Sequence, residues 1–257
     1  MSRIICIANQ KGGVGKTTTS VNLASSLAAA EKRVLIVDID PQGNATSGVG
    51  IDKSELKSSV YDLIINDENP SDVILDTELA SLRIIPATPD LAGAELELIE
   101  LTERESKLKK ILHPLKDQYD FIIIDCPPSL GLLTINAMTA ADTVLVPLQT
   151  EFYAMEGLSQ IVRTINLVQK GLNPSLRIEG ILLTMFDGRN NLSKQVEEEV
   201  REHFKDKVFR TVIPRNVRLS EAPSHGKPII LYDITSRGAT AYLELAKELI
   251  ERGGGNA

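Results

Sequence analysis

Cysteine and histidine are both scarce in this sequence, and neither is placed for chemistry. The two cysteines, Cys6 and Cys126, lie far apart and form no CxxC pair. This usage predicts two buried thiols in a reducing cytoplasm rather than a metal site. The three histidines, His113, His203 and His225, have neither metal-ligand spacing nor a nucleophile partner. We therefore expect them at ordinary surface or helix-end positions.

Long hydrophobic runs and an excess of positive charge are also missing. No stretch approaches the roughly 20 apolar residues that a membrane helix needs. The first ten residues, "MSRIICIANQ", hold only a short apolar run before a polar turn, so we expect no secretory signal. The net charge of −7 argues against a protein that coats nucleic acid indiscriminately, although it leaves room for a local basic patch. These absences favour a cytoplasmic protein without a membrane partner.

The sequence is rich in short apolar runs of strand length. Its composition is that of an ordinary globular protein, with 42% hydrophobic and 25% charged residues. The runs contain many β-branched residues and almost no alternation, which suits strands that are buried on both faces of a mostly parallel sheet. They span residues 4–8, 34–38, 82–87, 121–125, 143–147 and 180–184, and we expect a further strand over 208–214.

Helical apolar periodicity fills much of the sequence between these runs. We expect Pro114 to kink or restart one helix, and a closing helix to run from about residue 238 to 252. Strands that alternate with helices predict one α/β domain over residues 1–252, followed by a flexible tail at 253–257. The predicted buried faces are Leu158, Ile161, Val162, Ile165 and Val168; Leu192, Val196, Val200 and Phe204; Leu108, Ile111, Leu112 and Leu115; and Tyr242, Leu245, Ala246, Leu249 and Ile250.

A glycine-rich loop, "NQKGGVGKTT" at residues 9–18, follows the first predicted strand and precedes an apolar helix. That order is what a phosphate-binding loop requires, because glycines let backbone N–H groups turn toward phosphate oxygens at a helix N-terminus. Lys16 would neutralise the β- and γ-phosphates, and the Thr17 hydroxyl would complete a magnesium shell. The alternative is a glycine-rich turn that binds no nucleotide, which the order of strand, loop and helix disfavours.

The loop departs from the general pattern GxxxxGK(S/T), because Gln10 stands where a glycine is expected and a second lysine, Lys11, precedes the turn. It resembles the deviant phosphate loop of the ParA/MinD group of ATPases. The resemblance implies that Lys11 crosses an ATP-bound dimer to the partner's phosphates, as an arginine finger does. Gly12 would then be small so that two backbones can meet. An idle surface lysine is the alternative for Lys11.

Carboxylates follow two other predicted strands. Asp38 and Asp40 lie in "VDIDPQGNATSG", and Asp125 ends "YDFIIID", so all three face the ligand edge of a parallel sheet. Asp125 matches the acidic residue that holds Mg²⁺, usually through water, in P-loop NTPases. The resemblance implies that Asp40 orients the attacking water. Asp38 is then expected to support the magnesium shell, through water, or the loop itself.

The resemblance extends over nearly the whole chain and narrows to the ParA/Soj chromosome-partitioning branch. "PATPDLAGAELEL", "PPSLGLLTINAM", "EFYAMEGLSQ" and "VIPRNVRLSEAPSHGKPIILYD" are similar to that branch in order and spacing. It implies a single P-loop NTPase domain, with a twisted, mostly parallel sheet and helices on both faces. It also implies that Pro214 and Asn216 lie by the adenine. The implied nucleotide-binding residues are Lys11, Gly12, Gly13, Val14, Gly15, Lys16, Thr17, Thr18, Pro214 and Asn216.

The same resemblance implies an ATPase that uses ATP and Mg²⁺ and is slow on its own. Its ATP-dependent homodimer would bind double-stranded DNA without sequence preference and associate with the nucleoid. A ParB-type centromere-binding partner would stimulate hydrolysis and release it. The sequence leaves open whether the task is chromosome segregation, plasmid segregation or an influence on replication initiation.

A basic segment offers a surface for DNA. Residues 205–227 contain six Lys or Arg residues against two acidic ones, a net charge of +4 in an acidic chain. Such a segment is either a phosphate-contacting patch or a solvated charged edge. The resemblance favours the patch, and it places DNA contacts at Arg189 and Arg218.

Rival functions within the wider superfamily lack their own signals. A MinD-like membrane ATPase should end in a basic amphipathic helix, whereas "LELAKELIERGGGNA" balances its basic residues with glutamates. An iron–sulfur carrier would need clustered cysteines. A small-molecule kinase or synthetase would need an acceptor pocket that we cannot identify in the sequence, and a pure nucleotide-binding scaffold would lack turnover.

Overall fold

The structure is a computed structural model that describes residues 2–254. One sheet of seven strands forms its centre, in the order β3-β4-β2-β5-β1-β6-β7. All neighbouring strands pair in parallel except β3 and β4, which are antiparallel. The strands are β1 (Arg3–Ile7), β2 (Val34–Asp38), β3 (Leu75–Asp76), β4 (Leu82–Ile85), β5 (Phe121–Asp125), β6 (Thr143–Gln149) and β7 (Arg177–Thr184). The six apolar runs in the sequence are therefore confirmed as strands, and the two-residue β3 was not predicted.

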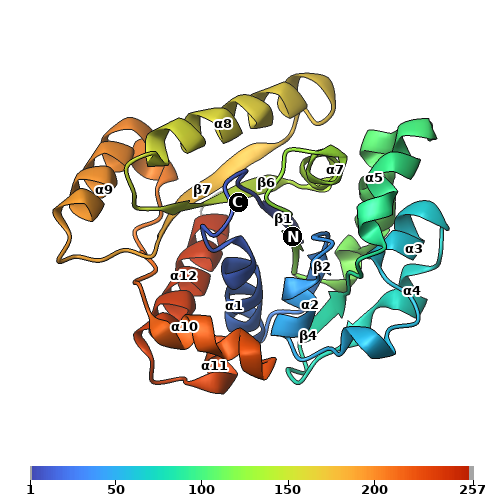
Figure 1. Cartoon of the computed structure of the whole chain (residues 1–257), viewed down its shortest axis with the longest axis horizontal. Coiled ribbons are helices and arrows are strands. Elements are labelled where there is room, and N and C mark those ends of the chain that lie inside the picture. The colour runs from blue at the N-terminus through green and yellow to red at the C-terminus, as the bar shows by residue number, and fades with distance from the viewer. Residues whose placement is uncertain (1, 255–257) are drawn as a thin grey trace.

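Helices cover both faces of the sheet (Figure 1). Side chains of β1 alternate between two hydrophobic clusters: Ile4 and Cys6 pack on one face, and Ile5 and Ile7 on the other. The first cluster is covered by α3 (Val60–Ile65), α5 (Leu91–Glu100), α6 (Lys107–Leu112), α7 (Leu132–Ala140), α8 (Ala154–Gly171) and α9 (Asn191–Phe204). The second is covered by α1 (Lys16–Ala29), α10 (Val217–Glu221), α11 (Ile229–Tyr232) and α12 (Arg237–Gly254). Two further short helices are α2 (Asn44–Gly48) and α4 (Pro70–Val73).

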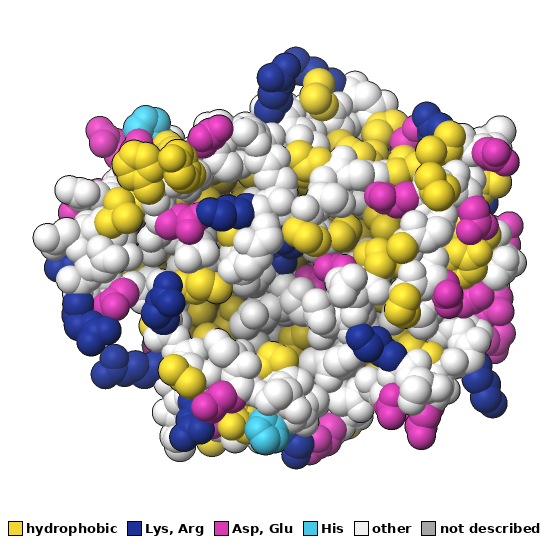
Figure 2. Space-filling model, viewed as in Figure 1, with side chains coloured by type: hydrophobic (Ala, Val, Ile, Leu, Met, Phe, Trp, Pro, Cys, Tyr) yellow, Lys and Arg dark blue, Asp and Glu magenta, His cyan; other side chains and the backbone are white. Residues whose placement is uncertain are grey.

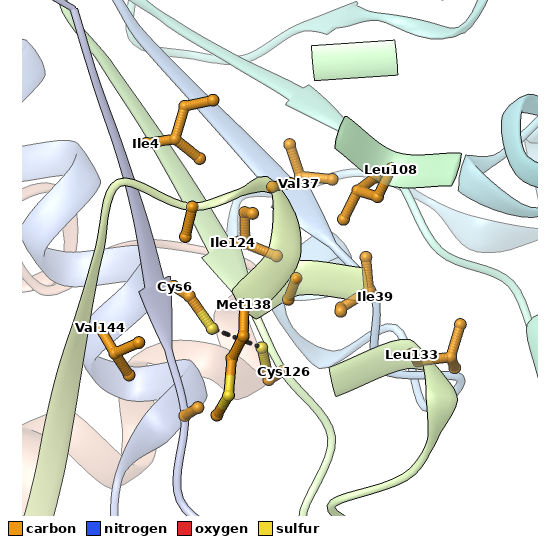
Figure 3. Packing of buried hydrophobic residues seen from close by; sticks show 14 of the residues in the cluster. Ile4, Cys6, Val37, Ile39, Leu108, Ile124, Cys126, Leu133, Met138 and Val144 are labelled. Carbon is orange, nitrogen blue, oxygen red and sulfur yellow. Dashed lines mark hydrogen bonds between the residues drawn. The ribbon is translucent and has the colours of Figure 1, made fainter. Parts of the chain in front are cut away.

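The two cysteines belong to the first cluster, as Figure 3 shows. Cys6 on β1 and Cys126 just after β5 are buried free thiols whose sulfur atoms lie 3.3 Å apart. Burial raises the pKa of the Cys126 thiol well above its usual value. This confirms the prediction of buried thiols.

The helices follow the predicted periodicity. At Pro114, α6 gives way to a 3₁₀ turn over His113–Gln118, as expected for a residue without an N–H. The closing helix α12 buries Tyr242, Leu245 and Leu249, and it continues to Gly254, two residues beyond the predicted end. The rest of the predicted tail, residues 255–257, lies outside the described residues. No helix in residues 2–254 is long and apolar enough to cross a membrane.

The prediction of a strand over 208–214 is wrong. This segment forms no ladder with β7 but two isolated bridges, one between Val208 and Ile181 and one between Pro214 and Phe186, which lies just beyond β7. In its middle, the N–H groups of Arg210 and Thr211 donate to the Glu248 carboxylate of α12, at 2.8 and 2.9 Å. A buried carboxylate thus takes the donors that a continuous ladder would have used, and the chain bends at Arg210.

The register of the sheet brings three chain segments together at one edge. Ile7 at the end of β1 pairs with Asp125 at the end of β5, and Asp125 pairs in turn with Asp38 at the end of β2. The glycine-rich loop leaves β1 at this point and enters α1. Parallel strands therefore place both carboxylates beside the loop.

Candidate nucleotide site

The glycine-rich loop joins β1 to α1 with two residues in the left-handed region. Gly13 has φ +73° and Gly15, which precedes the first residue of α1, has φ +89°. Only glycine adopts these angles without strain, so their positions shape the turn. Asn9 connects the loop to β6. Its Oδ1 accepts the Lys11 N–H at 3.0 Å, and its Nδ2 donates to the Pro147 carbonyl at 2.8 Å.

The Lys16 side chain is buried inside the loop, with 6% of the residue exposed. Its ammonium donates to the Lys11 carbonyl oxygen at 3.0 Å. Burial lowers the pKa of Lys16, while the nearby Asp125 carboxylate acts to raise it. An ammonium held in so little water gains most from an anionic ligand. The geometry suits the predicted phosphate role.

Asp125 is fully buried at the end of β5 and is tied to α1 on both oxygens. Thr17 Oγ1 donates to one carboxylate oxygen at 2.8 Å, and Ser20 Oγ donates to the other at 2.7 Å. Burial, and then the charge of Asp38, raise the pKa of Asp125. Hydroxyl and carboxylate oxygens suit Mg²⁺, and a divalent cation would relieve the cost of this buried charge. Thr17 and Asp125 therefore fit a magnesium site.

Ser20 was missed by the sequence reasoning. Its spacing of four residues from Lys16 places it one helical turn into α1, and it also donates to the Lys16 carbonyl at 3.1 Å. Only the fold reveals that the same turn faces Asp125. Among residues 2–254, no group of three or more His, Cys, Asp or Glu residues could hold a metal ion.

Asp38 anchors the segment that follows β2. Its carboxylate accepts the backbone N–H and the hydroxyl of Thr46, both at 2.8 Å, and the N–H of Asp40 at 3.1 Å. Thr46 Oγ1 also accepts the Ala87 N–H at 3.0 Å, so the network reaches the chain after β4. Burial raises the pKa of Asp38. Its contacts are those of a residue that holds the loop, which is one of the two roles expected for it.

Asp40 lies two residues further on and is 6% exposed. Its Oδ1 accepts the Gln42 N–H at 3.0 Å, and its carbonyl accepts the Gly43 N–H at 2.8 Å. The side chain is thus held by a tight turn through Oδ1, and its Oδ2 has no hydrogen bond to the described residues. A carboxylate in this state can accept a proton or a hydrogen bond from water.

A cavity of about 210 Å³ lies beside the end of the loop and the first turn of α1. It brings both predicted base contacts, Pro214 and Asn216, to the same space as Gly15 and Thr18. Asn216 Oδ1 accepts the Arg218 N–H at 2.8 Å as the cap of α10, which fixes the amide and leaves its NH₂ group for a ligand. Met185, another lining residue, has φ +51°, an unusual backbone angle for a residue with a side chain.

Lys11 stands apart from Lys16, Thr17 and Asp125. Its side chain is 45% exposed and its ammonium forms an ion pair with Glu151, which follows β6. The two lysines of the loop therefore differ sharply: Lys16 is buried beside Asp125, and Lys11 lies at the surface.

The predicted DNA contacts lie on a separate part of the surface. Dark-blue Lys and Arg side chains gather at the lower left of Figure 2, near the loops between α9 and α10. Arg189 is 92% exposed on its side chain and pairs with Asp187 at 3.0 Å. It lines a cavity of about 590 Å³ together with Arg215 and Arg237.

Arg218 does not line that cavity. It pairs with Glu221 at 2.8 Å and with Asp233 at 3.5 Å. Arg237 is the residue that sequence reasoning missed, because it lies outside the basic segment and reaches Arg189 only in the fold.

Strand, glycine-rich loop and helix, with a buried carboxylate on the adjacent strand, define a P-loop nucleotide triphosphatase. The family model described as an AAA domain matches residues 2–178. The sporulation initiation inhibitor protein Soj of Bacillus subtilis (strain 168) is 63% identical over 253 residues, which cover 98% of this chain and 100% of Soj. The chromosome partitioning protein ParA of Myxococcus xanthus (strain DK1622) is 60% identical, over 98% of this chain and 89% of that protein.

A solved structure adds the fold comparison. A cobyrinic acid a,c-diamide synthase from Mycobacterium smegmatis with bound ATP analog and magnesium superposes with a TM-score of 0.87 and 39% identity, covering 100% of this chain and 98% of that one. The chain belongs to the ParA/Soj family of chromosome-partitioning ATPases. The predicted fold class, enzyme class and family are confirmed.

Proposed function

We propose that this ATPase is a nucleotide-timed DNA-binding switch in chromosome or plasmid partition. ATP closes a homodimer, the dimer binds DNA without sequence preference, and a ParB-type partner releases it by stimulating hydrolysis. The observation that carries the proposal is the pair of loop lysines, because Lys16 is buried beside Asp125 whereas Lys11 lies at the surface. Partition by an ATPase is the activity of the family.

ATP and Mg²⁺ are the ligands that the site accommodates. Lys16 would bind the β- and γ-phosphates, while the loop N–H groups from Gly12 to Thr18 surround them. Thr17 would bind Mg²⁺ directly and Asp125 would hold it through water, with Asp38 behind it. When bound, Mg²⁺ neutralises charge on the phosphate oxygens. Pro214 and Asn216 would contact the adenine.

Hydrolysis needs a water aligned with the γ-phosphate. Asp40 is held by the turn at Gln42, and its remaining carboxylate oxygen can accept a hydrogen bond from that water. Orienting the water lowers the barrier without changing ATP affinity. We therefore assign to Asp40 the catalytic role that the family resemblance implies.

Lys11 would act across the dimer. Its ammonium pairs with Glu151, and its exposure allows it to meet a second copy. Gly12 supports the same model: a Cβ placed there would meet only the Pro128 Cβ, at 4.0 Å. The fold of one chain does not require a glycine at this position, whereas close approach of two backbones would.

Binding to DNA would use Arg189 and Arg218, with Arg215 and Arg237 beside Arg189 in its cavity. Phosphate contacts position a protein without reading sequence, which suits a protein that must hold any part of a nucleoid. Closing the dimer would double the basic surface of an acidic chain.

The test is the rate of ATP hydrolysis with the protein alone, with DNA, and with DNA plus a ParB-type partner. We expect slow turnover alone and a clear rise only in the complete mixture, because outside contacts must order the segments around Asp40. A high basal rate that responds to neither addition would identify an ordinary metabolic enzyme.

A further inference from the structure

The thiols of Cys6 and Cys126 are in direct contact beneath the nucleotide edge of the sheet. These two residues are the only cysteines in the sequence. Their sulfur atoms are 3.3 Å apart, so one thiol donates a hydrogen bond to the other, and Figure 3 shows the two side chains pointing toward each other. A disulfide bond needs a sulfur separation of about 2.05 Å. A short movement therefore separates this pair from a covalent bond.

The parallel register of the sheet creates this contact. Cys6 pairs with Ile124 of β5 on one side and with Val144 of β6 on the other, so its backbone is fixed between two strands. Cys126 lies two positions after Ile124, just beyond the end of β5. Because side chains alternate along a strand, both cysteines face the same side of the sheet, and they belong to the same hydrophobic cluster.

The two thiols are fully buried, which limits how fast a reagent can reach them. The chain that follows Cys126 forms neither helix nor strand until α7 begins, and Pro128 and Ser129 in this segment are exposed. Segments of this kind open locally more easily than the strands of a sheet. A small oxidant such as hydrogen peroxide should therefore reach the pair, although more slowly than it would reach a surface thiol.

Cys126 is bonded directly to Asp125, the carboxylate that accepts hydrogen bonds from Thr17 and Ser20 of α1. Cys6 is held by strands on both sides, whereas Cys126 lies beyond the end of its strand. A disulfide would therefore draw Cys126 toward β1 rather than move Cys6. This movement would shift the adjacent Asp125 away from its partners on α1.

We propose that Cys6 and Cys126 are a modification site, at which peroxide forms a reversible disulfide bond that weakens Mg²⁺-dependent nucleotide binding. One sulfur attacks hydrogen peroxide and breaks its O–O bond, which gives a sulfenic acid and one water. The second sulfur then attacks the first and displaces its hydroxyl group as another water. Two thiols thus lose two hydrogen atoms, and one peroxide becomes two waters. A dithiol reductant restores both thiols by exchange. The inference rests on the proposed function, in which Asp125 holds Mg²⁺.

The first test treats the folded chain with hydrogen peroxide and then alkylates the remaining thiols after unfolding. We expect wild type to lose both alkylation sites and to yield a peptide pair joined through Cys6 and Cys126 in mass spectrometry. Dithiothreitol should restore both sites. Cys6→Ala is the matched control, because it removes one sulfur atom from the cluster and leaves Cys126 without a partner. Two free thiols after treatment, or oxidation to sulfinic acids without a disulfide, would overturn the inference.

The second test measures the affinity for a non-hydrolysable ATP analogue with Mg²⁺ by isothermal titration. The oxidised wild type should bind about tenfold more weakly, as changes behind a metal ligand do. Its affinity for ADP in EDTA should change much less, because that complex holds no Mg²⁺. Peroxide-treated Cys6→Ala should bind like the untreated variant.

Three results of this titration would overturn the inference: a disulfide without loss of affinity, an equal loss in Cys6→Ala, or an equal loss for ADP in EDTA. A different result would identify a failure of the proposed function. If the reduced wild-type chain binds no nucleotide, or binds the analogue equally well with and without Mg²⁺, the proposed roles of Thr17 and Asp125 fail before any oxidation. The two failures can therefore be told apart.

Discussion

The nucleotide edge and the basic surface use charge in opposite ways. At the nucleotide edge, Lys16, Asp38 and Asp125 are buried and held by short hydrogen bonds. On the basic surface, Arg189 and Arg218 are exposed and pair with carboxylates close to them in sequence. A buried charge needs hydrogen-bond or ion-pair partners at defined positions. An exposed ion pair contributes little to stability, and its side chains can exchange partners readily. Function at the nucleotide edge therefore depends on the positions of single side chains, whereas function at the basic surface depends on the total positive charge.

The largest expected effect is at the buried lysine. Lys16→Ala should weaken nucleotide binding by on the order of 10²–10³-fold, because it removes a desolvated charge that, in our proposal, binds phosphate. Isothermal titration with ATP and Mg²⁺ measures it. Lys11→Ala is the control: it should bind ATP with near wild-type affinity, yet fail to dimerise. Equal losses of affinity in the two variants would erase the distinction between the lysines.

Asp40→Ala should have the second-largest effect, on the rate of ATP hydrolysis. The rate of hydrolysis should fall by about 10²-fold or more, since a group that positions the attacking water acts in the transition state. ATP affinity should be retained, and closed dimers should accumulate. Single-turnover kinetics with equilibrium binding separates these quantities, and unchanged turnover would remove Asp40 from its role.

Glu248 is a buried carboxylate that serves the fold rather than the nucleotide site, and its substitution is the next test. Burial acts to raise its pKa, but donors from Arg210, Thr211 and Arg252 prevail, so the pKa of Glu248 is lowered on folding. A lowered pKa stabilises the fold above the unfolded value of about 4.3, and this contribution is lost as pH falls through the folded value. Glu248→Gln should cost about 1–3 kcal/mol at pH 7.

Urea unfolding at several pH values checks this prediction. The difference between Glu248→Gln and wild type should shrink below about pH 4. The neighbouring Glu251→Gln, which removes an exposed partner of Arg210, should change stability by less than about 0.5 kcal/mol. Equal effects of the two substitutions would contradict the role of Glu248 in bending the 208–214 segment.

The smallest effects belong to the basic surface. Arg189→Glu should weaken DNA binding more than Arg218→Glu, because Arg189 shares its cavity with Arg215 and Arg237 whereas Arg218 is held by two carboxylates. Each should flatten the dependence of affinity on salt by about one unit of log–log slope per lost phosphate contact. Fluorescence anisotropy over a salt series measures both, with ATP-dependent dimerisation as the control. If neither reversal changes DNA affinity, the segment is a solvated edge.

The same contrast explains what the sequence could predict. The loop at 9–18 and the carboxylates at the ends of β2 and β5 were predictable because each depends on a short motif at a strand end. The parallel register of the strands then brings these motifs together. Ser20 was missed because its partner, Asp125, is distant in sequence. Thr46 was missed because only the fold of the segment after β2 returns it to Asp38, eight residues earlier. The strand expected over 208–214 was wrong for the same reason, since Glu248 lies on the closing helix. Arg237 was missed because it lies outside the basic segment at 205–227 and joins Arg189 and Arg215 only around the folded cavity.

The central claim is that nucleotide state controls DNA binding through the dimer. Its most direct test is sedimentation of the protein with double-stranded DNA of unrelated sequences, without nucleotide, with ADP and with a non-hydrolysable ATP analogue. We predict binding only with the ATP analogue, at equal affinity for each sequence, and loss of that binding in Lys11→Ala. Equal DNA binding in all three nucleotide states, or undiminished binding by Lys11→Ala, would contradict the account.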